Sequence, residues 1–260
     1  MQAGRVQSRP RPPPAPEPTV ATSDRYTPAA DPFYQPGEPA TPEGVSPDVL
    51  VSPDTRRTKR IPPGQTRTKK WPVLHAGRVP NVSRDDWSLT IDGLIERPMT
   101  LDWQQFQSLP RVKVFADFHC VTRWSRLANL WEGIATKELA QRAGVSPEAQ
   151  FVLVGGFDDG WTTNLPLGDF LSSEALFADL HDGRPLTADH GGPVRLIVPH
   201  LYAWKSAKWI KRVTFVRDDE LGYWERLGYH DRGDPWVRDD RHPDGERFRG
   251  APTSARSRAT

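Results

Sequence analysis

The sequence predicts an α+β domain with mixed β-sheets and peripheral helices. Segments with strand-like alternation outnumber segments with helical periodicity. The helical segments are separate insertions and not regular crossovers between strands, which favours α+β over α/β. Ten Trp and ten Phe can anchor a large core, and no internal repeat is present.

Proline and tryptophan divide the chain into a tail and a domain. Fifteen of the 27 prolines precede Gly64, and all ten tryptophans follow Lys70. The apolar fraction of 36% is low for a wholly folded chain. A proline-rich stretch cannot form a helix, because proline lacks the N–H and fixes φ. We therefore expect a disordered tail over residues 1–58, a folded domain over 59–240 and a disordered C-terminal tail over 241–260.

Alternation and turn residues place the elements of the domain in order. Extended segments are expected at residues 87–95, 113–121, 151–157, 161–167, 191–199 and 206–216. Helices are expected at residues 101–109, 131–145 and 167–180, the second of them ending at Gly144.

Composition excludes several classes of protein. The formal net charge of +2 gives no reason to expect nucleic acid as a partner. No apolar run long enough for a secretory signal or a membrane span occurs, so we expect a cytoplasmic protein without membrane insertion. A single Cys excludes an intramolecular disulfide and a cluster held by cysteines alone.

That single cysteine, Cys120, ends an apolar strand in the sequence DFHCVTRWSR. Arg123 and Arg126 follow it and His119 precedes it, and positive charge favours the thiolate that binds metals. Three interpretations remain open at this point: a buried core cysteine, a nucleophile with a histidine base, and a metal ligand.

A second stretch, DHGGPVRLIVPHLYAWKSAKWIKRV, gathers cations around a glycine-proline turn. Lys205 and Lys208 are three residues apart with small residues between them, so a ligand could approach the backbone closely. Together with His190, Arg195 and Ser206, these residues predict a site for a phosphate-bearing ligand. A solvated charged face is the alternative.

The segments HCVTRWS, GGPVRLIVP and KSAKWIKRV, in this order, resemble the molybdopterin domain of the sulfite-oxidase family. The likeness spans about residues 61–239 and includes WPVLHAG near the start of the domain. It implies a molybdenum bound by one pyranopterin and by Cys120. It also implies that the pterin or its phosphate contacts a set of matching positions, namely Leu74, His75, His190, Arg195, Ser206 and Lys208, with Lys205 adjacent.

Within this family the chain resembles the short, soluble bacterial sulfite-oxidase-like oxidoreductases. The resemblance implies two-electron oxygen-atom transfer on a small sulfite- or sulfoxide-like substrate. Arg123 would hold an oxyanion and Trp124 would shape the pocket. A separate haem or flavin protein would carry electrons, and a monomer is expected because the family's usual dimerisation domain is missing. Gly156 stands where the methionine-sulfoxide reductases have Thr, so one side-chain contact is expected to be missing.

The sequence leaves two other classes of function open. A non-catalytic binding or scaffold protein could use the same fold and recruit partners through its proline-rich tail. A Cys–His hydrolase would leave the cationic stretch without a role.

Overall fold

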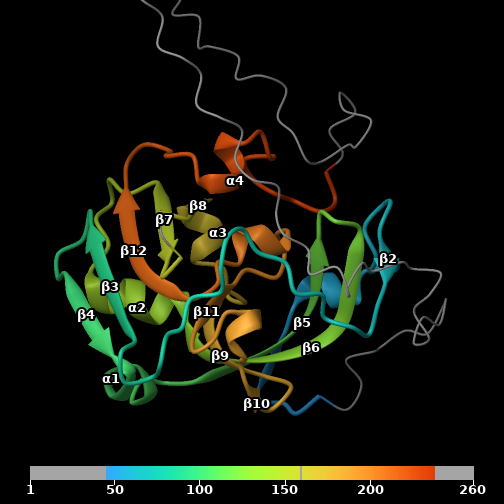
Figure 1. The fold of residues 1–260 in the computed structure, drawn as a ribbon, viewed down its shortest axis with the longest axis horizontal. Helices are drawn as coiled ribbons and strands as arrows, with labels where there is room; N and C mark the ends of the chain where they lie inside the picture. Colours follow the sequence, from blue (N-terminus) through green and yellow to red (C-terminus); the bar gives the residue numbers. More distant parts are fainter. Residues whose placement is uncertain (1–44, 159, 238–260) are drawn as a thin grey trace, which may run out of the picture.

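The computed structural model describes residues 45–158 and 160–237. Two β-sheets form the body of the molecule (Figure 1). The seven-stranded sheet has the order β1-β5-β6-β9-β10, with β2 paired to β6 and β11 paired to β9. Its strands are β1 (Val49–Val51), β2 (Thr66–Arg67), β5 (Val112–Cys120), β6 (Trp124–Ala135), β9 (Leu176–His181), β10 (Arg184–Pro185) and β11 (Arg195–Ile197).

The five-stranded sheet has the order β4-β3-β12-β7-β8. Its strands are β3 (Ser88–Gly93), β4 (Met99–Asp102), β7 (Phe151–Gly156), β8 (Thr162–Pro166) and β12 (Ile210–Val216). The pairs β1–β5, β2–β6 and β3–β12 are parallel and the remaining pairs are antiparallel. Both sheets are therefore mixed, as predicted.

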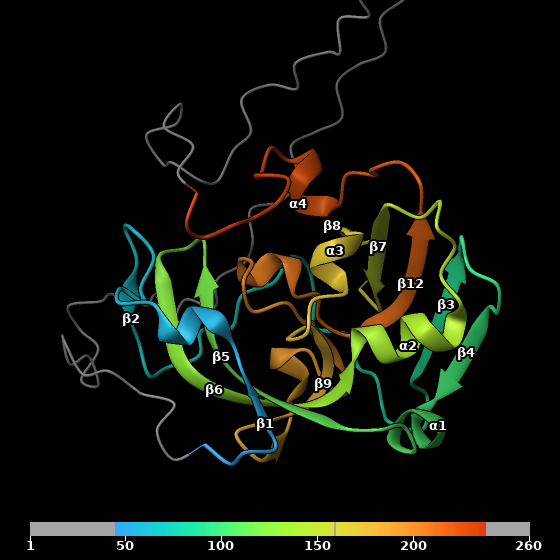
Figure 2. The ribbon, with the colours of Figure 1, turned by 180° about the vertical axis from the view of Figure 1, so that it is seen from behind.

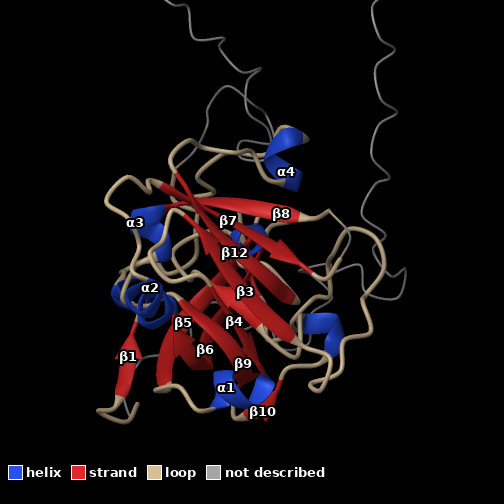
Figure 3. Ribbon diagram, turned by 90° about the vertical axis from the view of Figure 1, so that its left-hand side faces the viewer, coloured by secondary structure: helices blue, strands red, loops and turns tan. Residues whose placement is uncertain are grey.

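The helices are short and lie at the edges of the sheets (Figures 2 and 3). They are α1 (Trp103–Gln107), α2 (Thr136–Ala143), α3 (Leu167–Phe170) and α4 (Tyr223–Arg226), with 3₁₀ turns η2 (Pro53–Arg56), η3 (Ala188–His190) and η4 (Ala203–Lys205). Asp102 and Gln105 form a capping box that starts α1. None of the described helices has the length and apolar character that a membrane crossing requires.

Two buried clusters fill the body. The larger one joins both sheets, with Leu89 and Val213 from one sheet and Phe177 from the other. The smaller one lies on the β5–β6 hairpin and contains Phe118, Cys120, Trp124 and Trp131. The lone cysteine is thus built into a packed aromatic cluster.

Two predicted helices are wrong in extent. Residues 131–135 continue β6, so α2 begins at Thr136. Residues 176–181 form β9 and only Leu167–Phe170 is helical. The pairing of Trp131 with His181 joins β6 to β9, and burial of the first four β9 residues on both faces hides the strand alternation.

The N-terminal boundary of the domain also moves. Residues 49–56, placed in the tail from sequence, form β1 and η2. β1 extends the sheet beside β5, and Ser52 N–H donates to the Phe115 carbonyl at 2.9 Å. The rest of the predicted N-terminal tail before residue 45, and the C-terminal tail 241–260, lie outside the described residues.

Candidate functional site

Cys120 ends β5 immediately before the turn that leads into β6. Its side chain lies in the smaller cluster with Trp124, which is 3% exposed, and Leu74 packs against the same cluster. His119 Nδ1 lies 2.9 Å from Ser125 Oγ, and burial lowers the pKa of His119 to about 3. His119 is therefore neutral at pH 7 and is joined to Ser125.

The groups around the thiol differ from those that the sequence suggested. Arg126 is bound elsewhere, because its Nη2 lies 2.7 Å from Asp182 Oδ2 and its Nη1 lies 2.9 Å from His181 Nε2. Arg123 is exposed at a positive φ of 72°. Thr122 Oγ1 donates a hydrogen bond of 3.1 Å to the Cys120 sulfur. Sequence reasoning missed this hydroxyl, although it stands inside the quoted motif.

Arg195 links two of the predicted cofactor segments. It is 2% exposed, and its guanidinium donates to the carbonyls of His190 and Ser206, each at 2.9 Å. The guanidinium lies over the rings of Trp71 and Phe118 at 5.5 and 5.3 Å. Burial lowers the pKa of Arg195 to about 9. A buried cation of this kind attracts a negatively charged ligand.

His190 and Trp71 pack together although 119 residues separate them. Their ring centroids are 3.9 Å apart, and His190 Nε2 donates to the Trp71 carbonyl at 3.1 Å. The Thr187 hydroxyl lies 3.0 Å from Nδ1 of the same ring. Burial lowers the pKa of His190 to about 4, so the ring is neutral at pH 7. Sequence reasoning quoted the segment of Trp71 but did not select this residue.

Lys208 supplies a second cation. Its Nζ donates to the Asp189 carbonyl at 2.5 Å. Burial, and then repulsion from Arg195, lower the pKa of Lys208 to about 7, while Asp189, Asp158 and Cys120 act in the opposite direction. Because Cys120 acts on the pKa of Lys208, the thiol lies close enough to interact electrostatically with a lysine 88 positions later in the chain.

Two further predicted residues are His75, which is affected by the charge of Lys208, and Ser206, which lies two positions before it in the chain. Burial, and then the charge of Lys208, lower the pKa of His75, whose Nδ1 is buried without a hydrogen-bond partner among the described residues. The Ser206 hydroxyl accepts the N–H of Val198 at 3.0 Å. Gly191, with φ of 97°, lets the chain pass close to Lys208, because a Cβ there would lie 2.9 Å from the lysine side chain.

Lys205, the residue added to these predicted positions by its place in the chain, forms a buried ion pair. Its Nζ lies 2.6 Å from Glu225 Oε1 and donates to the Asn164 carbonyl at 2.8 Å, and both side chains of the ion pair are fully buried. The residue sits in η4, where the chain turns, so Lys205 and Lys208 do not share a face. These contacts join Lys205 to Glu225 of α4 and to Asn164 of β8.

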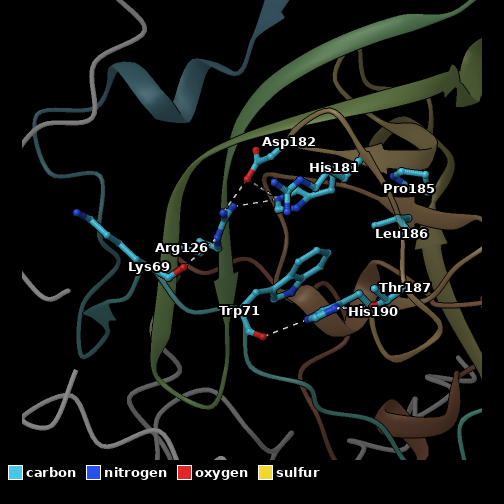
Figure 4. A pocket seen from close by; sticks show the side chains of 10 residues that line it. Lys69, Trp71, Arg126, His181, Asp182, Pro185, Leu186, Thr187 and His190 are labelled. Carbon is cyan, nitrogen blue, oxygen red and sulfur yellow. Dashed lines mark hydrogen bonds and ion pairs between the residues drawn. The ribbon is translucent and has the colours of Figure 1, made fainter. Parts of the chain in front are cut away.

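A pocket of about 470 Å³ opens next to this cluster (Figure 4). In the figure, Trp71 lies between Arg126 and His190, which come from different elements. The residues around the pocket are Lys69, Trp71, Arg126, His181, Asp182, Arg184, Pro185, Leu186, Thr187 and His190. Of the predicted cofactor residues only His190 lines it, so the pocket adjoins the predicted site through the Trp71–His190 pair.

Comparison with known proteins decides the family. A family model described as the oxidoreductase molybdopterin binding domain matches residues 76–224. The chain belongs to this family. It is an oxidoreductase that uses a molybdenum–molybdopterin cofactor, which confirms the resemblance stated above.

Several members of known name are similar to this chain. The uncharacterized oxidoreductase YuiH of Bacillus subtilis (strain 168) is 48% identical over 178 residues, which cover 68% of this chain and 89% of YuiH. The protein-methionine-sulfoxide reductase catalytic subunit MsrP of Campylobacter jejuni is 29% identical over 56% of this chain and 54% of MsrP. The nitrate reductase [NADH] of Solanum lycopersicum is 25% identical over 58% of this chain and 20% of its own length.

A solved structure supports the fold. The sulfane dehydrogenase SoxCD from Paracoccus pantotrophus superposes with a TM-score of 0.52 and 22% identity, covering 56% of this chain and 42% of that chain. At this identity the likeness concerns the fold alone, and it confirms the predicted sulfite-oxidase-type architecture with mixed sheets.

The residues of the site fit the cofactor of the family. Neither Arg195 nor Lys208 forms an ion pair with a carboxylate in the described part of the chain, and Arg195 Nε has no hydrogen-bond partner there. The phosphate of a molybdopterin would supply the negative charge that these cations lack. No group of three or more His, Cys, Asp or Glu among the described residues could hold a metal alone. A molybdenum here therefore needs the sulfur ligands of the pterin.

The expected gap at Gly156 has a structural explanation. A Cβ at this position would meet the Asp158 carboxylate and would lie 2.9 Å from the Lys208 carbonyl. The Asp158 side chain thus fills the space that a threonine would need. A family member with glycine here can place a different polar group beside Lys208.

Proposed function

We propose that this oxidoreductase transfers an oxygen atom to or from a small sulfite- or sulfoxide-like substrate, with Cys120 as the protein ligand of molybdenum. The observation that carries this proposal is the pair of cations formed by the buried Arg195 and the half-buried Lys208, because Arg195 and Cys120 both act on the pKa of Lys208. An anionic cofactor bound to these cations would present its metal to the thiolate. When bound, the cofactor supplies the two-electron redox change.

We assign the protein side chains to cofactor binding, to the wall of the pocket and to substrate binding. Leu74, His75, His190, Arg195, Ser206 and Lys208 would hold the pterin and its phosphate. Trp124 would form an apolar wall beside the metal, because it is buried with Cys120. Arg123, exposed at the turn after Cys120, would bind the oxyanion of the incoming substrate. The names of MsrP and nitrate reductase, which include a sulfoxide and an oxyanion, support this class of substrate.

A separate haem or flavin protein would exchange electrons with the molybdenum. The monomeric state and the cytoplasmic location stay predictions. A scaffold role for the proline-rich N-terminal residues also stays a prediction, since residues 1–44 lie outside the described part.

The test is a substrate screen on protein made in a host that synthesises molybdopterin. Metal and pterin analysis first establish loading, and sulfite, sulfoxides and N-oxides are then assayed with an artificial electron donor or acceptor. We expect turnover of at least one substrate. If the active substrate is an oxyanion, Arg123→Ala raises its KM by about tenfold, whereas the surface control Lys137→Ala leaves it unchanged. Fully loaded protein that turns over none of these compounds contradicts the proposal.

A further inference from the structure

Positive charge is concentrated in one short part of the chain. Residues 55–70, here named the basic segment, contain seven Lys or Arg and no Asp or Glu. The whole chain has 35 Lys and Arg against 33 Asp and Glu, so the rest of it has 28 against 33 and a net charge of −5. The small net charge of the chain therefore hides a strong local asymmetry.

The basic segment wraps the end of the hairpin that carries Cys120. Its strand β2 pairs in parallel with β6 at Trp124 and Ser125. Thr66 N–H donates to the Arg123 carbonyl at 3.0 Å, inside the turn that follows Cys120. Figures 1 and 2 show β2 against the ends of β5 and β6 from both sides. The segment is thus fixed to the part of the fold that holds the predicted metal ligand.

Most cations of the segment face solvent. Arg60 is half-buried, with its guanidinium Nε 2.8 Å from Asp117 Oδ2, and this ion pair anchors the segment to β5. The exposed cations of the segment are Arg56, Arg57, Lys59, Lys69 and Lys70, and Arg57 forms an ion pair with Asp54. Arg123, outside the segment, adds an exposed cation at the turn itself. Such a single-sign surface attracts a partner of the opposite charge and accelerates its association.

We propose that the basic segment is the docking surface for a small acidic electron-carrier protein. The inference rests on the proposed function, which needs a carrier near Cys120. A globular acidic partner is favoured over a long polyanion or an anionic membrane because the rest of the chain is net negative and would repel an extended anionic surface.

The number of electrons in each turnover sets the number of times that a one-electron carrier must dock. Reduction of a sulfoxide consumes two electrons and two protons and yields a sulfide and water. Oxidation of sulfite consumes water and yields sulfate, two protons and two electrons. A one-electron carrier, such as a flavodoxin cycling between its semiquinone and its fully reduced form, supplies or removes one electron per encounter. Two docking events accompany each turnover, so rapid, salt-sensitive association suits the surface better than a permanent complex.

The experiment compares two charge-reversal double variants of the cofactor-loaded full chain. Lys59→Glu with Lys70→Glu changes the basic segment at two exposed residues that do not line the pocket. Lys137→Glu with Arg142→Glu makes the same change in charge on α2, at the other end of the molecule in Figure 1. The probe is an acidic bacterial flavodoxin, and a basic c-type cytochrome is the control carrier. Kd is measured at low and at physiological salt, alongside the rate of electron transfer and dye-driven turnover.

We expect the Lys59–Lys70 variant to weaken flavodoxin binding and to slow electron transfer by about tenfold at low salt, with the effect shrinking as salt rises. The α2 variant should change both by less than about twofold, and both variants should keep wild-type turnover with the dye. Equal effects of the two variants would contradict the proposed docking surface. Tighter binding of the cytochrome, of anionic vesicles or of single-stranded DNA than of flavodoxin would also contradict it.

The binding measurement separates this inference from the proposed function. Loaded protein that turns over with the dye but binds flavodoxin without dependence on Lys59 and Lys70 contradicts the docking surface alone. Loaded protein without any turnover overturns the proposed function, and with it the role of this surface in electron delivery, whatever the binding data show.

Discussion

The Arg195 guanidinium donates a hydrogen bond of 2.9 Å to the main-chain carbonyl of Ser206, and a second one joins it to the carbonyl of His190. One buried cation thereby holds two loops that come together only in the folded chain. Both acceptors are neutral carbonyls, so the positive charge itself is not neutralised by them. A buried positive charge without a compensating negative charge suits a protein that binds an anionic cofactor.

Arg195→Met is expected to lower the molybdopterin content at least about tenfold, because one charge-assisted contact to the phosphate is worth roughly 1.5–3 kcal/mol. The thermal stability of the cofactor-free variant should be equal to or above that of cofactor-free wild type, because an unpaired buried cation is removed. Pterin fluorescence after oxidation and calorimetry measure the two effects. Full pterin content in the variant would exclude Arg195 from the cofactor site.

Lys208 gives the cofactor-free protein a defined pH dependence. Its pKa is lowered from 10.5 to about 7 on folding. Between these values the unfolded chain binds the extra proton and the folded chain does not, so stability rises as the pH rises from 7 towards 10.5. Lys208→Met should reduce this rise between pH 7 and pH 9 by on the order of 1 kcal/mol. Urea unfolding at both pH values tests this, and an identical pH slope in the variant would refute it.

Cofactor loading should weaken the same pH dependence. A bound phosphate favours the protonated amine and raises the pKa of Lys208. The loaded wild type is therefore expected to gain less stability than the cofactor-free protein between pH 7 and pH 9. A steeper rise in the loaded protein would show that the phosphate lies away from this lysine.

The ion pair of Lys205 and Glu225 has a structural role. Glu225→Gln should destabilise the protein by about 3–5 kcal/mol, because it leaves a buried ammonium group without its carboxylate. Lys205→Met combined with Glu225→Leu should recover most of this loss. Pterin content per folded molecule should stay at the wild-type level in the double variant, measured by fluorescence. A fall comparable to that of Arg195→Met would return Lys205 to the cofactor site.

Thr122 is expected to tune the metal through the sulfur of Cys120. A hydrogen bond to a thiolate withdraws electron density, so its loss stabilises the oxidised metal and lowers the reduction potential. Thr122→Val should lower the potential by about 40 mV, the equivalent of roughly 1 kcal/mol for one electron. Thr122→Ser, which keeps the hydroxyl, should stay near wild type in an EPR redox titration. Equal potentials in all three proteins would argue that the hydroxyl does not act on the metal.

Two of the predicted site residues lie on strands that the sequence also predicted, whereas two of the predicted helices were too long. Cys120 and Arg195 lie on β5 and β11, and strand patterns with nearby cations are visible in a single sequence. Trp71 was missed because its partner His190 is distant in the chain, and local patterns carry no information on that contact. The ion pair of Lys205 with Glu225 was not predicted, because spacing alone does not reveal the turn at η4.

The failures in secondary structure have one physical cause. The segment 167–180 contains apolar residues that suit either a helix or a strand buried on both faces, and periodicity does not separate these. Residues 176–181 form a strand because β9 pairs with β6 and with β11, and both pairings involve residues that are distant in the sequence. Tertiary contacts therefore override the local preference.

Ligation of molybdenum by Cys120 is the central claim, and X-ray absorption at the molybdenum edge tests it most directly. The measurement compares the sulfur coordination of the metal in loaded wild type and in Cys120→Ser, with unfolding curves as a check that the fold persists. The account predicts one sulfur ligand fewer in the variant, with the pterin retained on Arg195 and Lys208. An unchanged number of sulfur ligands in a variant that still holds molybdenum would contradict it.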